Sequence, residues 1–213
     1  MSEIETQLLV MADLQAHHNR QVHPEWERQG HAYYRAVWVE CAELLDHYGW
    51  KWWKRQEADL DQVRLEIVDI WHFGLSELIR AGELRAGHVS PALRDAVAAG
   101  LAADAVDFRA AVESLAARTL ETRGFPIGEF FAVMRSLPMS FEELFRHYVG
   151  KNVLNQFRQA HGYQAGTYRK NWGGREDNVH LMEIAGALDD ASPRFADELM
   201  AALEARYRAS ATS

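Results

Sequence analysis

Apolar residues recur at helical spacing over most of the chain, and the alternation typical of strands is nearly absent. Ser2 with Glu5, and Ser140 with Glu143, have the spacing of capping boxes, so each pair marks the start of a helix. Glycine and proline mark the ends of the periodic segments. The pattern predicts helices over about residues 2–19, 32–48, 59–82, 140–161, 177–189 and 193–208.

The segment from about residue 83 to 138 differs from the rest because it is rich in alanine and interrupted by glycine and proline. It predicts two or three helices in a looser layer or lid. The fold class is therefore all-α, a helical bundle core with a smaller helical layer. We expect a single domain over residues 1–213, with 83–138 as a candidate mobile helical subdomain.

Composition narrows the class of protein. The chain has 23 Lys+Arg against 31 Asp+Glu, a formal net charge of −8, which disfavours general nucleic-acid binding. No apolar run reaches the length of a membrane span, and the N-terminus lacks the features of a signal peptide. Cys41 is the single cysteine, so no intrachain disulfide can form. These features predict a cytoplasmic protein with no membrane or nucleic-acid partner.

Two predicted helices each carry a pair of acidic residues at i, i+3 spacing. Glu40 and Glu43 lie on one helix, Glu66 and Asp69 on the next, and each pair shares a helix face. A short connection favours an antiparallel arrangement, which brings both pairs to the same height. Such pairs often belong to a solvated helix face, but Glu66 and Asp69 stand in the apolar string LEIVDIWHF. We therefore interpret the four carboxylates as a metal site.

The ligand set indicates which metal. Oxygen ligands select hard cations, so Mg²⁺ is expected and Mn²⁺ is a possible substitute. A di-iron site is a poor fit because neither Glu is followed by His at i+3. His72, one turn after Asp69, could support the site or the substrate, and a packed core histidine is an equally good interpretation.

Basic residues that could bind phosphate gather near the C-terminus. The 23 basic residues comprise 19 Arg and four Lys, and the lysines fall only in a Trp-rich and a Gly-rich region. Ordinary surface charge would explain any one of them, but together they favour ammonium groups that bind phosphate. The candidates are Lys151, Arg158, Lys170 and Arg175. The residues alone thus indicate a metal-dependent phosphoester or phosphoanhydride hydrolase.

Longer strings resemble a known family. The ExxE and ExxD pairs look like the all-α nucleoside triphosphate pyrophosphohydrolases. ECAELLDHYGWKWWK, EIVDIWHF and YVGKNVLNQFRQAHGYQAGTYRKNWGGREDN resemble the dimeric, Mg²⁺-dependent dUTPases, as does MADLQAHHN. The resemblance implies a homodimer that hydrolyses dUTP to dUMP with release of pyrophosphate. It leaves dUDP open as a second substrate, with phosphate as the other product.

The resemblance also implies roles for individual residues. Glu40, Glu43, Glu66 and Asp69 would be the metal ligands, and Glu43, with Glu40 as the alternative, would position or deprotonate the attacking water. The four basic candidates would hold the phosphates. The implied base and sugar contacts are Gln15, Asn19, Trp53, His72, Asn155, Tyr168 and Asn178.

Two other functions remain open at this point. One is an all-α pyrophosphohydrolase that shares the metal site but recognises a different base. The other is a non-catalytic, dUTPase-like protein that binds nucleotides and responds to them.

Overall fold

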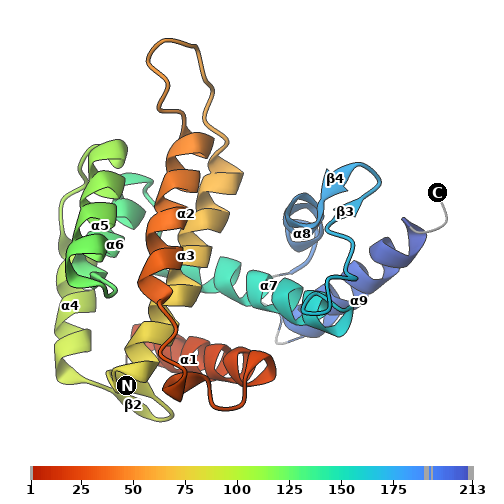
Figure 1. Cartoon of the computed structure of the whole chain (residues 1–213), viewed down its shortest axis with the longest axis horizontal. Coiled ribbons are helices and arrows are strands. Elements are labelled where there is room, and N and C mark those ends of the chain that lie inside the picture. Colours follow the sequence, from red (N-terminus) through yellow and green to blue (C-terminus); the bar gives the residue numbers. More distant parts are fainter. Residues whose placement is uncertain (1, 190–191, 193, 211–213) are drawn as a thin grey trace. The chain divides into compact units, whose positions relative to one another are not determined.

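The computed structural model describes residues 2–189, 192 and 194–210, and nine α-helices account for most of them. The helices are α1 (Glu3–Val22), α2 (Tyr33–Tyr48), α3 (Leu60–Arg80), α4 (Pro91–Ala102), α5 (Phe108–Thr122), α6 (Ile127–Ser136), α7 (Phe141–Ala160), α8 (Asp177–Ala185) and α9 (Phe195–Ala209). A single 3₁₀ turn, Trp26–Arg28, follows α1. The all-α prediction is confirmed (Figure 1).

Local sequence explains where the helices begin and end. At the start of α1, the Glu5 amide donates to Ser2 Oγ at 3.2 Å and the Ser2 amide to the Glu5 carboxylate at 3.2 Å. Ser140 and Glu143 make the same reciprocal pair before α7, at 2.7 and 3.1 Å. Both predicted capping boxes are therefore confirmed.

The predicted boundaries hold to within a few residues. Helix α1 extends three residues past Asn19, and α8 ends at Ala185 rather than near residue 189. Helix α9 begins at Phe195, and the predicted start at Pro193 lies outside the described residues. The segment 83–138 contains three helices, at the upper end of the expected number.

Four short strands form two hairpins that the apolar pattern did not predict. Strands β1 (Leu84–Arg85) and β2 (His88–Val89) pair antiparallel, as do β3 (Asn171–Trp172) and β4 (Arg175–Glu176). Two-residue strands are too short to show alternation, which is why sequence periodicity missed them. Gly173 and Gly174 form the turn of the second hairpin, both with positive φ, a conformation that other residues rarely adopt.

The chain falls into two compact units, residues Met1–His147 and Tyr148–Ser213, and the boundary lies within α7. Residues 83–138 fold as part of the first unit. Whether they move as a subdomain, and whether the whole chain acts as one domain, stay predictions.

In the first unit, α2 and α3 pack side by side, α1 packs on α3, and α5 packs on α2 (Figure 1). The core centres on Trp71 of α3, which is fully buried. Its ring stacks on Phe130 of α6 at 5.0 Å and meets Phe141 of α7 edge-on at 6.5 Å. The Trp71 indole N–H donates to Met11 Sδ at 3.2 Å, which ties α1 to the same cluster. This packing fixes the position of α3 and therefore the positions of Glu66 and Asp69 relative to α2.

The second unit has its own aromatic core. Phe157 of α7 lies 5.5 Å from Trp172 of β3 and 5.3 Å from Tyr207 of α9, measured between ring centroids. Trp172 in turn stacks on His180 of α8 at 5.0 Å. The hairpin β3–β4 is therefore held between α7, α8 and α9.

Candidate active site

Three of the four predicted metal ligands come together on the packed faces of α2 and α3. The carboxylates of Glu40, Glu43 and Glu66 each offer an oxygen, and these oxygens all lie within 4.8 Å of one another. Glu66 is buried, Glu40 is partly buried and Glu43 is exposed. The i, i+3 spacing on α2 and the packing of α3 against it produce this grouping.

Asp69, the fourth predicted ligand, is not in that group of three, but its charge acts on Glu40. The pKa of Glu40 is raised to about 9 because burial, the largest cause, and the neighbouring charges of Asp69, Glu66 and Glu43 all act in that direction. A hydrogen bond between Glu40 and Glu66 adds to the effect. The crowded carboxylates therefore favour either protonation of Glu40 or a bound cation.

His47, near the end of α2, is a neighbour of the cluster that the sequence did not single out. Its Nε2 lies 3.5 Å from Oε1 of Glu66, and the side chain is about one-third exposed. The His47 carbonyl accepts from the Asp59 amide at 2.9 Å, so the residue also joins the end of α2 to the start of α3.

Gln15, Asn19 and His72, three of the predicted base and sugar contacts, form one buried polar network between α1 and α3. The Gln15 amide donates to Asn19 Oδ1 at 3.0 Å, and the Asn19 amide donates to Ser76 Oγ at 2.9 Å. His72 Nδ1 lies 2.7 Å from Gln15 Oε1. Ser76, which donates on to the His72 carbonyl at 3.0 Å, is a member that the sequence analysis missed. One turn separates it from His72, a spacing that could have indicated it.

Trp53 lies in the connection between α2 and α3, residues 49–59, which we call the tryptophan loop. Its side chain is 58% exposed and makes edge-to-face contacts with Trp50 at 5.3 Å and Trp52 at 5.5 Å. Its assignment to a uracil pocket stays a prediction.

In the second unit, Lys151 and Arg158 of α7 meet the start of α8. Lys151 is buried and its Nζ donates to Asn178 Oδ1 at 3.0 Å. Arg158 donates to Asn155 Oδ1 at 3.2 Å and to Asn178 Oδ1 at 3.3 Å. Two predicted phosphate ligands and two predicted base or sugar contacts are thus brought together within this unit.

Asp177 organises the same cluster, and the sequence analysis did not select it. Arg158 Nε and Nη2 each donate to one of its carboxylate oxygens at 2.8 Å, and the Tyr168 hydroxyl donates at 2.8 Å. Burial favours the neutral acid, but these hydrogen bonds and the Arg158 charge outweigh it, so the pKa of Asp177 lies below its ordinary value. Burial and the Asp177 charge raise the pKa of Tyr168, which therefore stays a neutral donor.

Lys170 and Arg175 stand on either side of the hairpin turn, and both are about half exposed. Lys170 pairs with Glu176 at 3.0 Å. Burial would lower the pKa of Lys170, but the hydrogen bond and charge of Glu176 raise it overall. Arg175 pairs with Glu183, which also binds Arg206 at 2.8 Å, so Arg175 belongs to a separate ion-pair group.

Within the described residues, no helix is long and apolar enough to cross a bilayer.

The chain is an all-α protein in which two packed helices gather carboxylates, an arrangement of the kind that can hold a divalent metal in hydrolytic enzymes. A family model described as dUTPase matches residues 7–163, most of the chain. The chain belongs to this family, the all-α dimeric dUTPases, and is accordingly a dUTP diphosphatase with a nucleotide substrate.

The match runs from within α1 to just past the end of α7 and so includes the carboxylates and Lys151, Asn155 and Arg158. Four of the other predicted site residues follow it in the chain, namely Tyr168, Lys170, Arg175 and Asn178. No curated protein with a significant match to the chain was found.

Proposed function

We propose that the chain hydrolyses dUTP to dUMP and pyrophosphate in a Mg²⁺-dependent reaction, with Glu40, Glu43, Glu66 and Asp69 as the metal ligands. The observation that carries this proposal is the convergence of three carboxylates on α2 and α3. The residues fit the ion, because an all-oxygen set suits Mg²⁺ or Mn²⁺. The pKa of Glu40 is raised by burial and then by the negative charge of its neighbours, and a cation relieves that repulsion.

The burial of the carboxylates supports a division of roles. Glu40 and Glu66 are the more buried members, suited to holding an ion. Glu43 is the exposed one, and its carboxylate can accept a proton from the attacking water. When bound, Mg²⁺ supplies positive charge to the phosphate oxygens and to the water.

The remaining roles belong to the polar networks of each unit. Lys151, Arg158, Lys170 and Arg175 bind the phosphates. Amide groups suit a uracil edge because they have both donors and acceptors, and this supports base or sugar recognition by Gln15, Asn19, Asn155 and Asn178. Trp53, His72 and Tyr168 complete the proposed contacts. The same phosphate ligands would accept dUDP, with phosphate as the second product.

A substrate panel tests this proposal. The purified protein is incubated with dUTP, dUDP, dTTP, dCTP and ATP, with Mg²⁺, with Mn²⁺ or with EDTA, and the products are separated by ion-exchange chromatography. We expect dUTP to be hydrolysed fastest, dUMP and pyrophosphate to form, and EDTA to abolish the reaction. Equal or faster hydrolysis of dTTP, dCTP or ATP would mean that the enzyme reads another base.

A matched pair of variants tests the catalytic role of Glu43. Glu43→Gln should abolish hydrolysis while dUTP binding is retained, because the amide cannot accept the proton of water. Glu113→Gln, on the exposed face of α5, is the control and should keep full activity. Binding of dUTP by the wild type with no hydrolysis under any metal condition would instead favour a nucleotide-responsive binding protein.

Further expectations concern assembly and location. The family resemblance supports a homodimer, which sedimentation velocity tests; a monomer at working concentration would contradict it. The net charge of −8 supports the absence of a nucleic-acid partner. We also expect a cytoplasmic protein with no membrane partner, which fractionation of cells tests.

A further inference from the structure

The tryptophan loop connects the two helices that carry the carboxylates, and much of it is exposed. Trp50, Trp52 and Trp53 are 46%, 90% and 58% exposed. The loop has no regular secondary structure between Gly49 and Asp59. A loop of this kind keeps one conformation only if its backbone groups are held by other parts of the protein.

Gln56 holds the loop from within. Its side-chain Oε1 accepts the backbone amides of Trp50, at 3.0 Å, and Lys51, at 2.6 Å. The chain passes very close at this point, since a Cβ placed on Gly49 would lie 2.9 Å from the Gln56 Cβ. Gly49 has φ +93°, so this position requires glycine on both counts.

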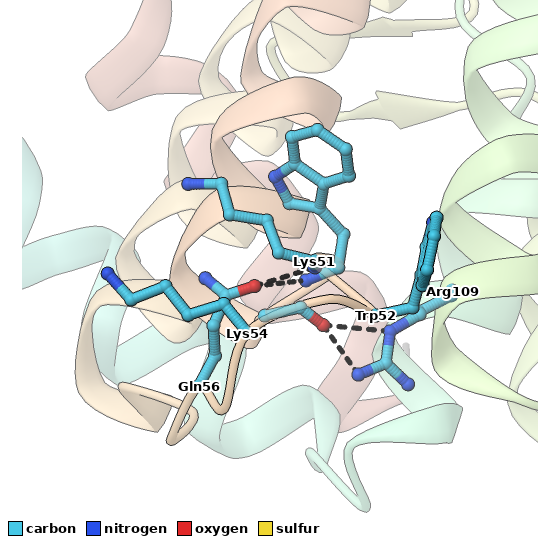
Figure 2. Close-up of a pocket in the computed structure, with 7 residues that line it drawn as sticks. Lys51, Trp52, Lys54, Gln56 and Arg109 are labelled. Atoms are coloured by element: carbon cyan, nitrogen blue, oxygen red, sulfur yellow. Dashed lines mark hydrogen bonds between the residues drawn. The ribbon is translucent and has the colours of Figure 1, made fainter.

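Arg109 of α5 holds the loop from outside. Its Nε donates to the Gly49 carbonyl at 2.8 Å, and its Nη2 donates to the same oxygen (Figure 2). The guanidinium lies 4.9 Å from the centre of the Tyr48 ring, and that ring is 4.2 Å from Phe108. The packed aromatic pair thereby fixes the direction of the Arg109 side chain.

The two anchors act on one peptide group. Arg109 binds the carbonyl of the Gly49–Trp50 peptide, and Gln56 binds its N–H. With donor and acceptor both engaged, this peptide cannot rotate without breaking hydrogen bonds on either side. It lies at the end of α2, three residues before Trp53, and so sets the direction in which the loop leaves the helix.

A cavity of about 420 Å³ surrounds these contacts, lined by Gly49, Trp50, Lys51, Trp52, Lys54, Gln56 and Arg109. Figure 2 shows Lys51 and Lys54 extending away from the guanidinium of Arg109, and Lys51 Nζ pairs with Asp46 at 3.1 Å. The three cations do not converge on one point. The contacts of Arg109 therefore indicate a structural role, which is to hold the loop in place.

We propose that Arg109 and Gln56 are positioning residues of the dUTPase reaction, which fix the Gly49–Trp50 peptide and so hold the tryptophan loop in the conformation that receives the base. This inference rests on the proposed function, in which Trp53 contacts the base. In this role both residues act through the loop and need no contact with the substrate. The segment 83–138 thus contributes to the site through α5.

The first test compares Arg109→Ala with Arg118→Ala, an exposed arginine of the same helix whose ion pair is with Glu121. The Arg109 variant should raise KM for dUTP by about tenfold and leave kcat within about twofold, since the loop contacts the base and not the reacting phosphate. Arg109→Lys should have a KM between those of the wild type and Arg109→Ala, because an ammonium cannot make both hydrogen bonds. Arg118→Ala should match the wild type. An unchanged KM in Arg109→Ala would overturn the proposal.

The second test measures how well the loop is held, by limited proteolysis, and does not depend on enzymatic activity. Trypsin can cleave after Lys51, Lys54 and Arg55, and we expect Arg109→Ala and Gln56→Ala to be cut there about tenfold faster than the wild type. Gln56→Glu keeps the acceptor oxygens and should stay close to the wild type in both cleavage and KM. Equal cleavage of all variants would overturn the proposal.

The two readouts separate the two hypotheses. A wild type that does not hydrolyse dUTP would refute the proposed function, while faster cleavage of the variants would still show that the anchors hold the loop. A wild type that is active, with variants unchanged in KM, would refute only the positioning role.

Discussion

Arg158 binds Asp177 through two parallel hydrogen bonds, from Nε and Nη2, each 2.8 Å from a different carboxylate oxygen. The Asp177 side chain is 0% exposed and that of Arg158 is 12% exposed. The pair joins α7 to the first residue of α8, so a side chain proposed to bind phosphate also holds the second unit together.

Stability of the second unit should depend on this pair and on pH. Asp177→Asn leaves Arg158 without its charged partner and should lower the free energy of unfolding by about 3 kcal/mol near neutral pH. The pKa of Asp177 lies below its ordinary value of 3.8, so the ion pair stabilises fully above that pH. Its contribution is lost as the pH falls further, through the pKa of the folded state.

Urea unfolding of wild type and Asp177→Asn at several pH values checks this. The difference between them should stay constant from neutral pH to about 5 and shrink below about 4. Glu198→Gln, which removes a more exposed pair with Arg194 in the same unit, should cause no measurable change. A difference that persists unchanged into strong acid would contradict the prediction.

Divalent cations should stabilise the first unit through the carboxylate cluster. Mg²⁺ at about one hundred times its dissociation constant adds about 2.7 kcal/mol, which corresponds to a rise in Tm of about 5–10 °C. Glu66→Gln, which removes a buried carboxylate proposed as a ligand, should reduce this shift strongly, and Glu113→Gln should keep it. Scanning calorimetry with Mg²⁺ and with EDTA measures the shift; the same shift in Glu66→Gln would place the bound ion elsewhere.

Replacing either of two glycines by alanine should change the stability of the protein, but in opposite directions. A Cβ on Gly74 of α3 would lie 2.5 to 2.7 Å from atoms of the Phe125 ring, so Gly74→Ala should destabilise by about 2 kcal/mol. At Gly128 of α6 nothing lies within 4 Å of such a Cβ, and Gly128→Ala should stabilise by about 0.5 kcal/mol. Thermal unfolding of both variants tests the close approach of Phe125 to α3.

The network between α1 and α3 should serve stability and substrate binding together. Asn19→Ala removes its bonds with Gln15 and Ser76 in a buried place, which costs about 2 kcal/mol. KM for dUTP should rise as well, given the proposed base contact. Asp13→Ala, exposed on α1, is the control for both measurements. A loss of stability with unchanged KM would assign the network a purely structural role.

The local signals of the sequence were sufficient for most of the helices. Capping boxes at Ser2 and Ser140 mark helix starts because each residue finds its partner three positions away. Gly49 marks the end of α2 for a similar reason, since only local backbone conformation is involved. The acidic i, i+3 pairs also predicted that carboxylates would meet, and three of the four do, because a short connection leaves two packed helices little choice of register.

Contacts between residues far apart in the chain could not be predicted from these local signals. Arg109 binds a carbonyl 60 positions earlier in the chain, and Asn19 meets Ser76 across 57 positions. Nothing in the sequence around Arg109 distinguishes it from Arg118, the other arginine of α5. Asp177 likewise gains its role from α7, which brings Arg158 to it.

The sequence by itself therefore determined the helices, their apolar faces, the pairing of the carboxylates and the resemblance to the dUTPases, because these depend on residues a few positions apart or on whole strings of residues. Only the tertiary structure decided which polar groups are buried and which partners they have: the Gln15–Asn19–Ser76 network, the Arg158–Asp177 pair and the hold of Arg109 on Gly49. Those partners depend on how helices pack, and packing is settled by the whole core at once.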